Sequence, residues 1–252
     1  RQVLANLPRW RGSSPFSFAE LTEFYRANGA GLFARHRAFL WEDGALCPVE
    51  QPDCPGADEM LGYELQRNRV IANTRAMLEG NLVNNVLLYG DSGTGKSATV
   101  KNLLTLPGFE ALRLIEVQKE GLADLPRLIR TLGGRRLKFI LFIDDLAFDQ
   151  DDKTYSSLKT ILEGGLEKRP LNVAIYATSN RRHLIKETLS DRSGDDIHEA
   201  DTRQELMSLS ARFGLTVTFQ RPEKARFEVI LTELAKQHGI CLLYTSPSPR
   251  DA

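Results

Sequence analysis

Apolar and polar positions alternate along most of this chain in blocks that predict helices and short buried strands in turn. Five apolar runs have the composition of buried strands: Asn85–Tyr89, Leu112–Val117, Phe139–Ile143, Val173–Thr178 and Leu215–Phe219. Apolar residues at helical spacing fill the stretches around them, over Glu64–Leu78, Lys96–Leu104, Leu125–Leu132, Tyr155–Leu166 and Glu199–Leu209. This alternation predicts an α/β fold, a three-layer αβα sandwich around a five-stranded parallel sheet.

The first 58 residues have a different pattern, which predicts a small helical N-terminal region and a linker. Ser17 and Glu20 form a capping box before residues at helical spacing, and a second helix is expected over Leu32–Trp41. The stretch Asp43–Asp58, with its prolines and acids, is interpreted as a linker. Further on, Asp124 is expected to cap the helix that follows it. Packing rather than ligand binding is expected of the aromatic residues Phe24, Tyr25, Phe33, Phe39 and Trp41.

Length and composition limit the class of protein. The 252 residues suffice for one core and a smaller satellite, and 33 basic and 33 acidic residues cancel, so no global attraction to nucleic acid or membranes is expected. No apolar run has the length of a membrane span and no signal peptide is visible, which favours a cytoplasmic protein with no membrane partner. Cys47 and Cys54 lack zinc-ligand spacing, and three cysteines make no disulfide framework.

A phosphate-binding loop follows the first buried strand. The sequence GDSGTGKS at 90–97 matches G-x-x-x-x-G-K-[ST], with a strand before it and a helical stretch after it. Glycines let backbone N–H groups turn toward a polyphosphate, Lys96 can reach the β- and γ-phosphates, and Ser97 offers a hydroxyl to Mg²⁺. The chain is therefore expected to bind a nucleoside triphosphate with Mg²⁺ through Gly90, Asp91, Ser92, Gly93, Thr94, Gly95, Lys96 and Ser97.

Polar residues end two further strands. The buried run Phe139–Ile143 ends in Asp144 and Asp145, which should face the loop because ligands bind outside the carboxyl ends of such strands. Asp144 fits the role of holding Mg²⁺, and Asp145 that of polarising the attacking water. At the next strand end, the Asn180 amide could orient that water or touch the γ-phosphate. Arg212 stands just before the last strand.

Together these motifs, in this order, resemble an AAA+ ATPase. More narrowly, three runs are similar to a bacterial AAA+ family catalogued as domain of unknown function 815: NNVLLYG at 84–90, LEGGLEKRP at 162–170 and YATSNRRHL at 176–184. The resemblance covers about Leu21 to Leu234, and the second and third runs are quite specific to that family.

The resemblance implies ATP as the nucleotide and a role for each matching residue. Asn180 takes the sensor-1 place, and Arg212 the place of an arginine finger that reaches the γ-phosphate of a neighbouring subunit. The run Leu61, Gly62 and Tyr63 matches the box that packs near adenine. AAA+ proteins usually carry Asp-Glu where this chain has Asp-Asp, so the second acid, Asp145, is one methylene shorter. A lid with a sensor-2 arginine should follow the helix expected over Glu223–Gln237.

Four parts are expected on this basis. Residues 1–58 form the helical region and linker, 59–220 the nucleotide-binding core, and 221–240 the start of a helical lid. The segment 241–252 resembles a translated sequencing adapter and is interpreted as a non-native tail, since Ser-Pro-Ser-Pro interrupts a helical pattern. Arg1 is not an initiator methionine, so upstream residues are expected to be missing.

Two functions remain open at this stage. The first is a ring-forming ATPase, a homo-oligomer with a hexamer as the expected size, that remodels a protein or DNA partner. The second is a nucleotide-gated binding module with little or no turnover. A small-molecule kinase is disfavoured by the placement of Asn180 and Arg212. Two basic clusters can be solvated faces or DNA contacts, namely Arg135, Arg136 and Lys138, and Arg181, Arg182 and His183.

Overall fold

One sheet of seven strands runs through the part of the chain that the computed structural model describes, residues 17–56, 59–146, 158–162, 169–180, 211–237 and 239. The strand order is β2-β1-β4-β5-β6-β3-β7. The strands span β1 Ala38–Glu42, β2 Ala45–Val49, β3 Asn85–Gly90, β4 Leu112–Val117, β5 Lys138–Ile143, β6 Val173–Asn180 and β7 Gly214–Phe219. All five predicted strands are present and parallel to their neighbours among them, but the predicted count of five is wrong, because β1 and β2 extend the sheet.

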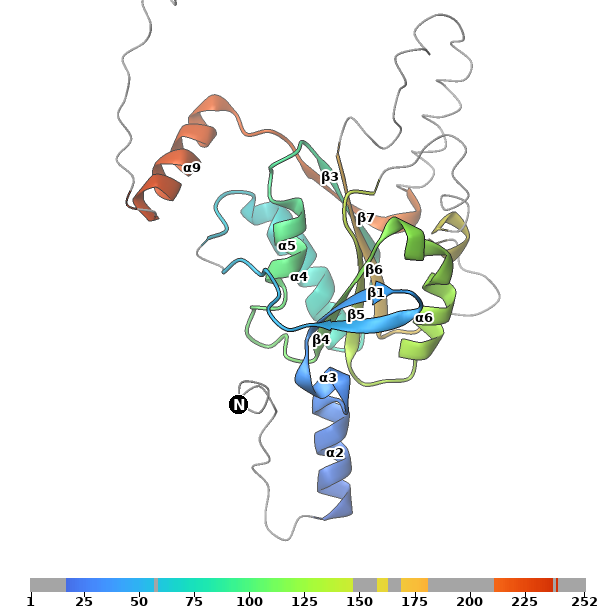
Figure 1. Cartoon of the computed structure of the whole chain (residues 1–252). Helices are drawn as coiled ribbons and strands as arrows, with labels where there is room; N and C mark the ends of the chain where they lie inside the picture. The colour runs from blue at the N-terminus through green and yellow to red at the C-terminus, as the bar shows by residue number, and fades with distance from the viewer. Residues whose placement is uncertain are drawn as a thin grey trace, which may run out of the picture.

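Helices cover both faces of this sheet, as expected for a three-layer αβα sandwich (Figure 1). Side chains alternate along each strand, so Phe139, Leu141 and Ile143 of β5 pack with α6, whereas Ile140 and Phe142 pack with α4 and α5. The helices span α2 Phe18–Asn28, α3 Leu32–Arg35, α4 Glu64–Leu78, α5 Lys96–Asn102, η1 Lys119–Asp124, α6 Leu125–Leu132 and α9 Lys224–Gln237. In the described part of the chain, none of them is long and apolar enough to cross a membrane.

The expected helix over Leu32–Trp41 is wrong in its second half. Helix α3 ends at Arg35, and Ala38–Glu42 forms β1, which pairs in parallel with β4. The apolar run is too short for periodicity alone to distinguish a helix from a strand, and the free edge of β4 decides it. Within the expected linker, Ala45–Val49 forms β2 at the sheet edge, where Pro48 is tolerated. Residues 38–49 therefore share one sheet with the core predicted for 59–220.

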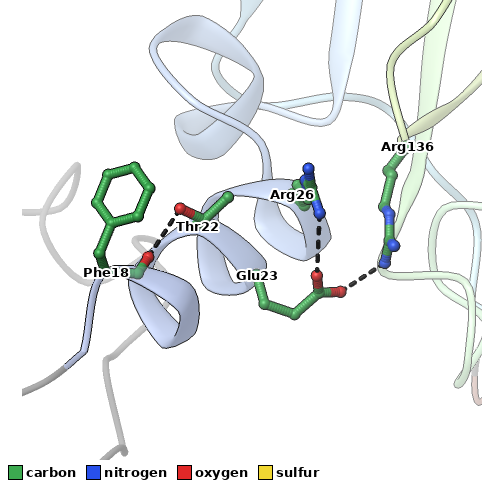
Figure 2. A network of polar contacts seen from close by, with 5 residues as sticks. All are labelled: Phe18, Thr22, Glu23, Arg26 and Arg136. Atoms are coloured by element: carbon green, nitrogen blue, oxygen red, sulfur yellow. Dashed lines mark hydrogen bonds and ion pairs between the residues drawn. The ribbon is translucent and has the colours of Figure 1, made fainter.

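Helix α2 begins at the predicted capping box and stands against the body of the protein through polar contacts. The Glu20 amide donates to Ser17 Oγ over 3.2 Å, and the Ser17 amide donates to Glu20 Oε2 over 2.8 Å. Figure 2 shows Glu23 between two arginines, Arg26 on its own helix at 3.8 Å and Arg136 before β5 at 2.5 Å. Helix α2 has no fully buried residue, although Leu21 and Phe24 are half-buried, and its last residue, Asn28, accepts a hydrogen bond from Arg113.

The predicted basic cluster of Arg135, Arg136 and Lys138 lies at the start of β5, and its two arginines contact residues of the N-terminal region. Arg136 pairs with Glu23, while the Arg135 guanidinium lies 5.1 Å from the centre of the Phe33 ring. Burial lowers the pKa of Lys138. Phe33 itself is buried beside Phe39, so the packing role expected of these two aromatic residues is confirmed.

Several expected helix features can be compared with the structure. Helices α4 and α6 have the predicted bounds, and α9 begins one residue after the expected Glu223. Asp124 is the N-cap residue of α6, but its side chain makes no cap hydrogen bond, since η1 brings the chain in with helical dihedral angles. The helix over Glu199–Leu209, the cluster Arg181, Arg182 and His183, the tail 241–252 and most of Tyr155–Leu166 lie outside the described residues.

Candidate nucleotide-binding site

The phosphate-binding loop connects β3 to α5 at the carboxyl edge of the sheet. Gly95 is the N-cap of α5 with φ of 82°, a left-handed conformation that favours glycine. The loop is closed by a hydrogen bond of 2.8 Å from Thr94 Oγ1 to the Asp91 carbonyl. The Asp91 amide donates to the Phe219 carbonyl over 3.1 Å, and Asp91 Oδ2 accepts from the Arg221 amide over 2.9 Å. The loop is thus attached to the end of β7 and to the segment that leads into α9.

Gly90 is required where the loop leaves β3, because its backbone lies against β7. Its φ is 146°, and a Cβ at this position would lie 1.9 Å from the Phe219 carbonyl oxygen. We expect Gly90→Ala to separate β3 from β7 and to lower the melting temperature, by on the order of 10 °C for a loss of a few kcal/mol. Circular dichroism melts would measure the change. Gly93→Ala is the matched control, because its Cβ would meet nothing within 4 Å although its φ is also positive. Equal melting temperatures for the two variants would contradict this account.

Lys96 lies inside the loop with 6% of its surface exposed. Its Nζ donates to the carbonyls of Gly90 and Asp91 over 3.1 and 2.7 Å and to Asn180 Oδ1 over 2.9 Å. Burial lowers the pKa of Lys96, while the charges of Asp145, Asp91 and Asp144 oppose this shift. The single amine thus connects the start of the loop with the end of β6.

The two acids after β5 are held in different ways. Asp144 Oδ1 accepts from Ser97 Oγ over 2.6 Å and from Thr178 Oγ1 over 2.5 Å. Asp145 has a φ of 50°, a left-handed conformation in the turn that follows β5. Its Oδ1 accepts from the amide of Asn180 over 2.7 Å. Asp144 is therefore bound to both α5 and β6, whereas Asp145 is bound to the Asn180 side chain at the end of β6.

These contacts bring predicted residues together from separate parts of the chain. Lys96 binds Asn180, Asn180 binds Asp145, and Ser97 binds Asp144. Parallel pairing produces this arrangement, because Gly90 of β3 lies opposite Asn180 of β6, and Ile143 of β5 lies opposite Ala177. The loop, the two acids and the amide therefore share one end of the sheet.

The oxygen atoms of Ser97 and Asp144 fit Mg²⁺, which prefers hard oxygen ligands. Across the described residues, no group of three or more His, Cys, Asp or Glu side chains could hold a metal ion alone. This agrees with the usual mode of Mg²⁺ binding, in which one or two protein ligands act together with phosphate oxygens and water.

The predicted adenine box lies beside the start of the loop, next to the end of β7. Tyr63 has a φ of 57°, its ring lies 5.2 Å from that of Phe219, and its hydroxyl donates to the Gln220 carbonyl over 2.7 Å. A Cβ on Gly62 would come within 2.9 Å of the Ile230 side chain on α9. Leu61, Gly62 and Tyr63 thus contact or adjoin the segment from β7 to α9 rather than the acids.

Arg212 lies near the amino end of β7, whereas the loop lies at the carboxyl ends of the strands. It precedes β7, whose Gly214 pairs with Asn85 and whose Phe219 pairs with Gly90. The five residue steps between these pairs correspond to about 16 Å, which is longer than an arginine side chain. The structure therefore does not bring Arg212 together with the other predicted site residues of the same chain.

Thr178 is a site residue that the motif analysis missed. Its hydroxyl binds Asp144, and it is 2% exposed. The available signal was its place two residues before Asn180 on one strand, because alternate residues point to the same face.

Comparisons with known proteins bear on the fold and the family. Thermotoga maritima RuvB, described as a Holliday junction branch migration motor, is 17% identical with a TM-score of 0.45; the match covers 73% of this chain and 54% of that one. A variant of the same RuvB gives a TM-score of 0.48 at the same identity and coverage. The Aeropyrum pernix ORC1 protein in complex with DNA is 17% identical with a TM-score of 0.48, over 71% of this chain and 50% of that one.

This chain thus spans about half the length of the solved proteins that it matches. No curated protein sequence matches it. The family model described as "Protein of unknown function (DUF815)" matches residues 34–246, which include the whole described sheet and the phosphate-binding loop. With its αβα core and its G-x-x-x-x-G-K-S loop, this chain belongs to the DUF815 family.

Proposed function

We propose that this protein binds Mg·ATP at the carboxyl edge of the sheet and hydrolyses it between the subunits of a ring, to remodel a macromolecular partner. The observation that carries the proposal is the set of contacts from Lys96 through Asn180 to Asp145, beside the contact of Ser97 with Asp144. These side chains supply a cation for phosphate, a ligand for Mg²⁺ and a carboxylate for water within one site.

Each residue has a separate task in this proposal. The Lys96 amine would exchange its bonds to loop carbonyls for the β- and γ-phosphate oxygens. Ser97 and Asp144 would hold Mg²⁺, which neutralises charge on the phosphates. Asp145 would accept the proton of the attacking water, while Asn180, already bonded to it, orients that water. The carboxyl edge thus supplies the groups for phosphate, Mg²⁺ and water, and Arg212 is proposed to add a second cation for the γ-phosphate.

The position of Arg212 is the reason for proposing a ring. Arg212 precedes Gly214, which lies about 16 Å along β7 from Phe219 beside the loop, so Arg212 would serve a nucleotide bound to another subunit. A homo-oligomer, with a hexamer as the proposed size, would place Arg212 of one subunit against the γ-phosphate held by the next. The same geometry does not fit a kinase that completes its site within one chain.

The remodelled partner is proposed only as a macromolecule, protein or DNA, because the residues of the nucleotide site do not distinguish these two classes. Steady-state ATP hydrolysis by the full-length protein, alone and with single-stranded DNA or an unfolded protein, tests the proposal. Stimulation by one polymer identifies the partner class. Nucleotide binding with no turnover under any condition supports the alternative, a nucleotide-gated binding module.

Lys96→Ala is expected to weaken Mg·ATP binding by about 100-fold or more, because it removes the only side-chain cation seen within the described loop. Titration with a fluorescent ATP analogue measures the effect. Lys101→Ala, at the far end of the same short helix, is the matched control and should bind as the wild type does. Unchanged affinity in Lys96→Ala would mean that the nucleotide binds elsewhere.

A further inference from the structure

A single buried hydroxyl contacts both acids of the site. Thr178 Oγ1 donates to Asp144 Oδ1 over 2.5 Å and accepts from the Asp145 backbone amide over 2.9 Å. A threonine hydroxyl has one hydrogen to donate, so donation to Asp144 leaves its lone pairs for the Asp145 amide. One oxygen atom therefore makes both hydrogen bonds, and its residue, Thr178, is 2% exposed.

The strand register places this hydroxyl level with the acids. The last pair between β5 and β6 is Ile143 with Ala177. Asp144 follows directly after β5, and Thr178 is the next residue of β6. Side chains alternate along a strand, and the even-numbered residues of β6, such as Tyr176, pack on the face covered by α4 and α5. Thr178 and Asn180 therefore follow on the face toward α5, which carries Ser97.

Backbone contacts hold the turn after β5 against the same two residues of β6. The Leu146 amide donates to the Thr178 carbonyl over 2.7 Å, and Ser179 Oγ donates to the Leu146 carbonyl over 2.7 Å. Within this fixed turn, Asp145 has its left-handed φ of 50°. The Thr178 hydroxyl is the member of this set that touches a side-chain carboxylate.

All three hydrogen bonds described for the Asp144 carboxylate fall on Oδ1, from Ser97 Oγ, Thr178 Oγ1 and the Asp145 amide. Three donors on one oxygen fix the rotation of the carboxylate. They leave Oδ2 as the oxygen that can turn to Mg²⁺ or to a water in its shell.

We propose that Thr178 is a positioning residue that sets the orientation of Asp144 for Mg²⁺ and the backbone of Asp145 for its contact with water. This inference rests on the proposed ATPase site and extends it. Thr178 touches neither nucleotide nor metal; it acts through the two acids. Its loss should therefore change the Mg²⁺ requirement more than the affinity for nucleotide alone.

The test compares Thr178→Val, which keeps the shape but loses the hydroxyl, with Thr178→Ser, which keeps the hydroxyl. Binding of a fluorescent ATP analogue is titrated with Mg²⁺ and repeated in EDTA. Thr178→Val should raise the half-saturating Mg²⁺ concentration about tenfold or more, since a hydrogen bond to a charged group is lost. Its affinity in EDTA should stay within about twofold of wild type, and Thr178→Ser should restore most of the Mg²⁺ dependence.

Ser179→Ala is the matched control, because Ser179 holds the same turn without touching either carboxylate. It should lower the melting temperature and leave the Mg²⁺ dependence unchanged. Thr178→Ala serves in place of Thr178→Val if valine prevents folding. In the protein without nucleotide, the effects of Thr178→Val and Asp144→Ala on unfolding should be non-additive, because each change removes one partner of the same hydrogen bond.

Wild-type Mg²⁺ dependence in Thr178→Val, or equal defects in Thr178→Val and Thr178→Ser, would overturn the inference and leave the proposed function standing. Additive unfolding effects of Thr178→Val and Asp144→Ala would also overturn it. A wild-type protein whose nucleotide binding ignores Mg²⁺ would overturn the proposed function and this inference together.

Discussion

Replacing Arg212 by alanine is expected to abolish ATP hydrolysis, by a factor on the order of 10³ or more, while ATP binding survives. A guanidinium supplied across an interface stabilises charge that develops only in the transition state. The pairing of β7 with β3 puts Arg212 at the far edge of the sheet from its own loop, so the effect should depend on assembly. Steady-state hydrolysis by the assembled full-length protein measures it, with Arg69→Ala on α4 as a matched arginine control.

Mixing two inactive variants provides the decisive form of this experiment. Arg212→Ala and Lys96→Ala should each be nearly inactive alone. In a mixed ring, some interfaces join an intact loop on one subunit to an intact Arg212 on the next, and these should recover part of the activity. No recovery in verified mixed oligomers, or full activity of the Arg212→Ala protein as a monomer, would refute a finger supplied in trans.

The second large effect is expected from Asp145. Asp145→Asn should lower turnover by about 10²- to 10⁴-fold and leave nucleotide binding intact, because the amide cannot accept the proton of the attacking water. Asp144→Asn should instead weaken Mg²⁺-dependent binding, because the neutral amide lacks the charge with which Asp144, beside Ser97, would hold Mg²⁺. Binding titrations and steady-state rates on both variants separate the two roles.

The matched control for these substitutions is Asp124→Asn, because Asp124 precedes α6 and its side chain caps nothing there. It should bind and hydrolyse ATP as the wild type does. Equal effects of Asp144→Asn and Asp145→Asn on nucleotide affinity would contradict the proposed division of roles. Full turnover in Asp145→Asn would show that another group, such as Asn180, suffices to activate water.

The backbone at Asp145 compensates for a shorter side chain at this position, where AAA+ proteins usually have glutamate. The left-handed backbone at Asp145 and the hydrogen bond of 2.7 Å from Asn180 hold the shorter carboxylate beside the amide and next to Lys96. A longer side chain is therefore not needed for the carboxylate to meet the Asn180 amide.

Local patterns were sufficient for the central part of the fold. Within the predicted strands, Phe139–Ile143 and Val173–Ala177 are continuous apolar runs, and burial on both faces of a parallel sheet requires that composition whatever their neighbours are. The helices α4 and α6 were predicted to the residue because their ends carry strong signals, such as Gly80 after α4. The loop motif at 90–97 also depends on local geometry, including the left-handed Gly95.

The N-terminal strands depended on tertiary structure. Ala38–Glu42 can be apolar on one face of a helix or of a strand, and only the unpaired edge of β4 selects the strand. The run that begins at Asn84 carried the family resemblance, but its sequence did not reveal a purpose for Asn85. In the structure, Asn85 Oδ1 accepts from the Ile175 amide over 3.0 Å and from Arg169, and so connects β3 to β6.

The sequence by itself determined which chemical groups the site has, since each stands in a short motif next to a buried strand. Tertiary structure decided which groups meet, because strand order and register are set by contacts between distant segments. Parallel pairing brought Asn180 beside Asp145 and Lys96, placed the Thr178 hydroxyl level with Asp144, and put Arg212 at the opposite edge of the sheet. Spacing along the chain contains none of these distances, which arise only when the sheet assembles.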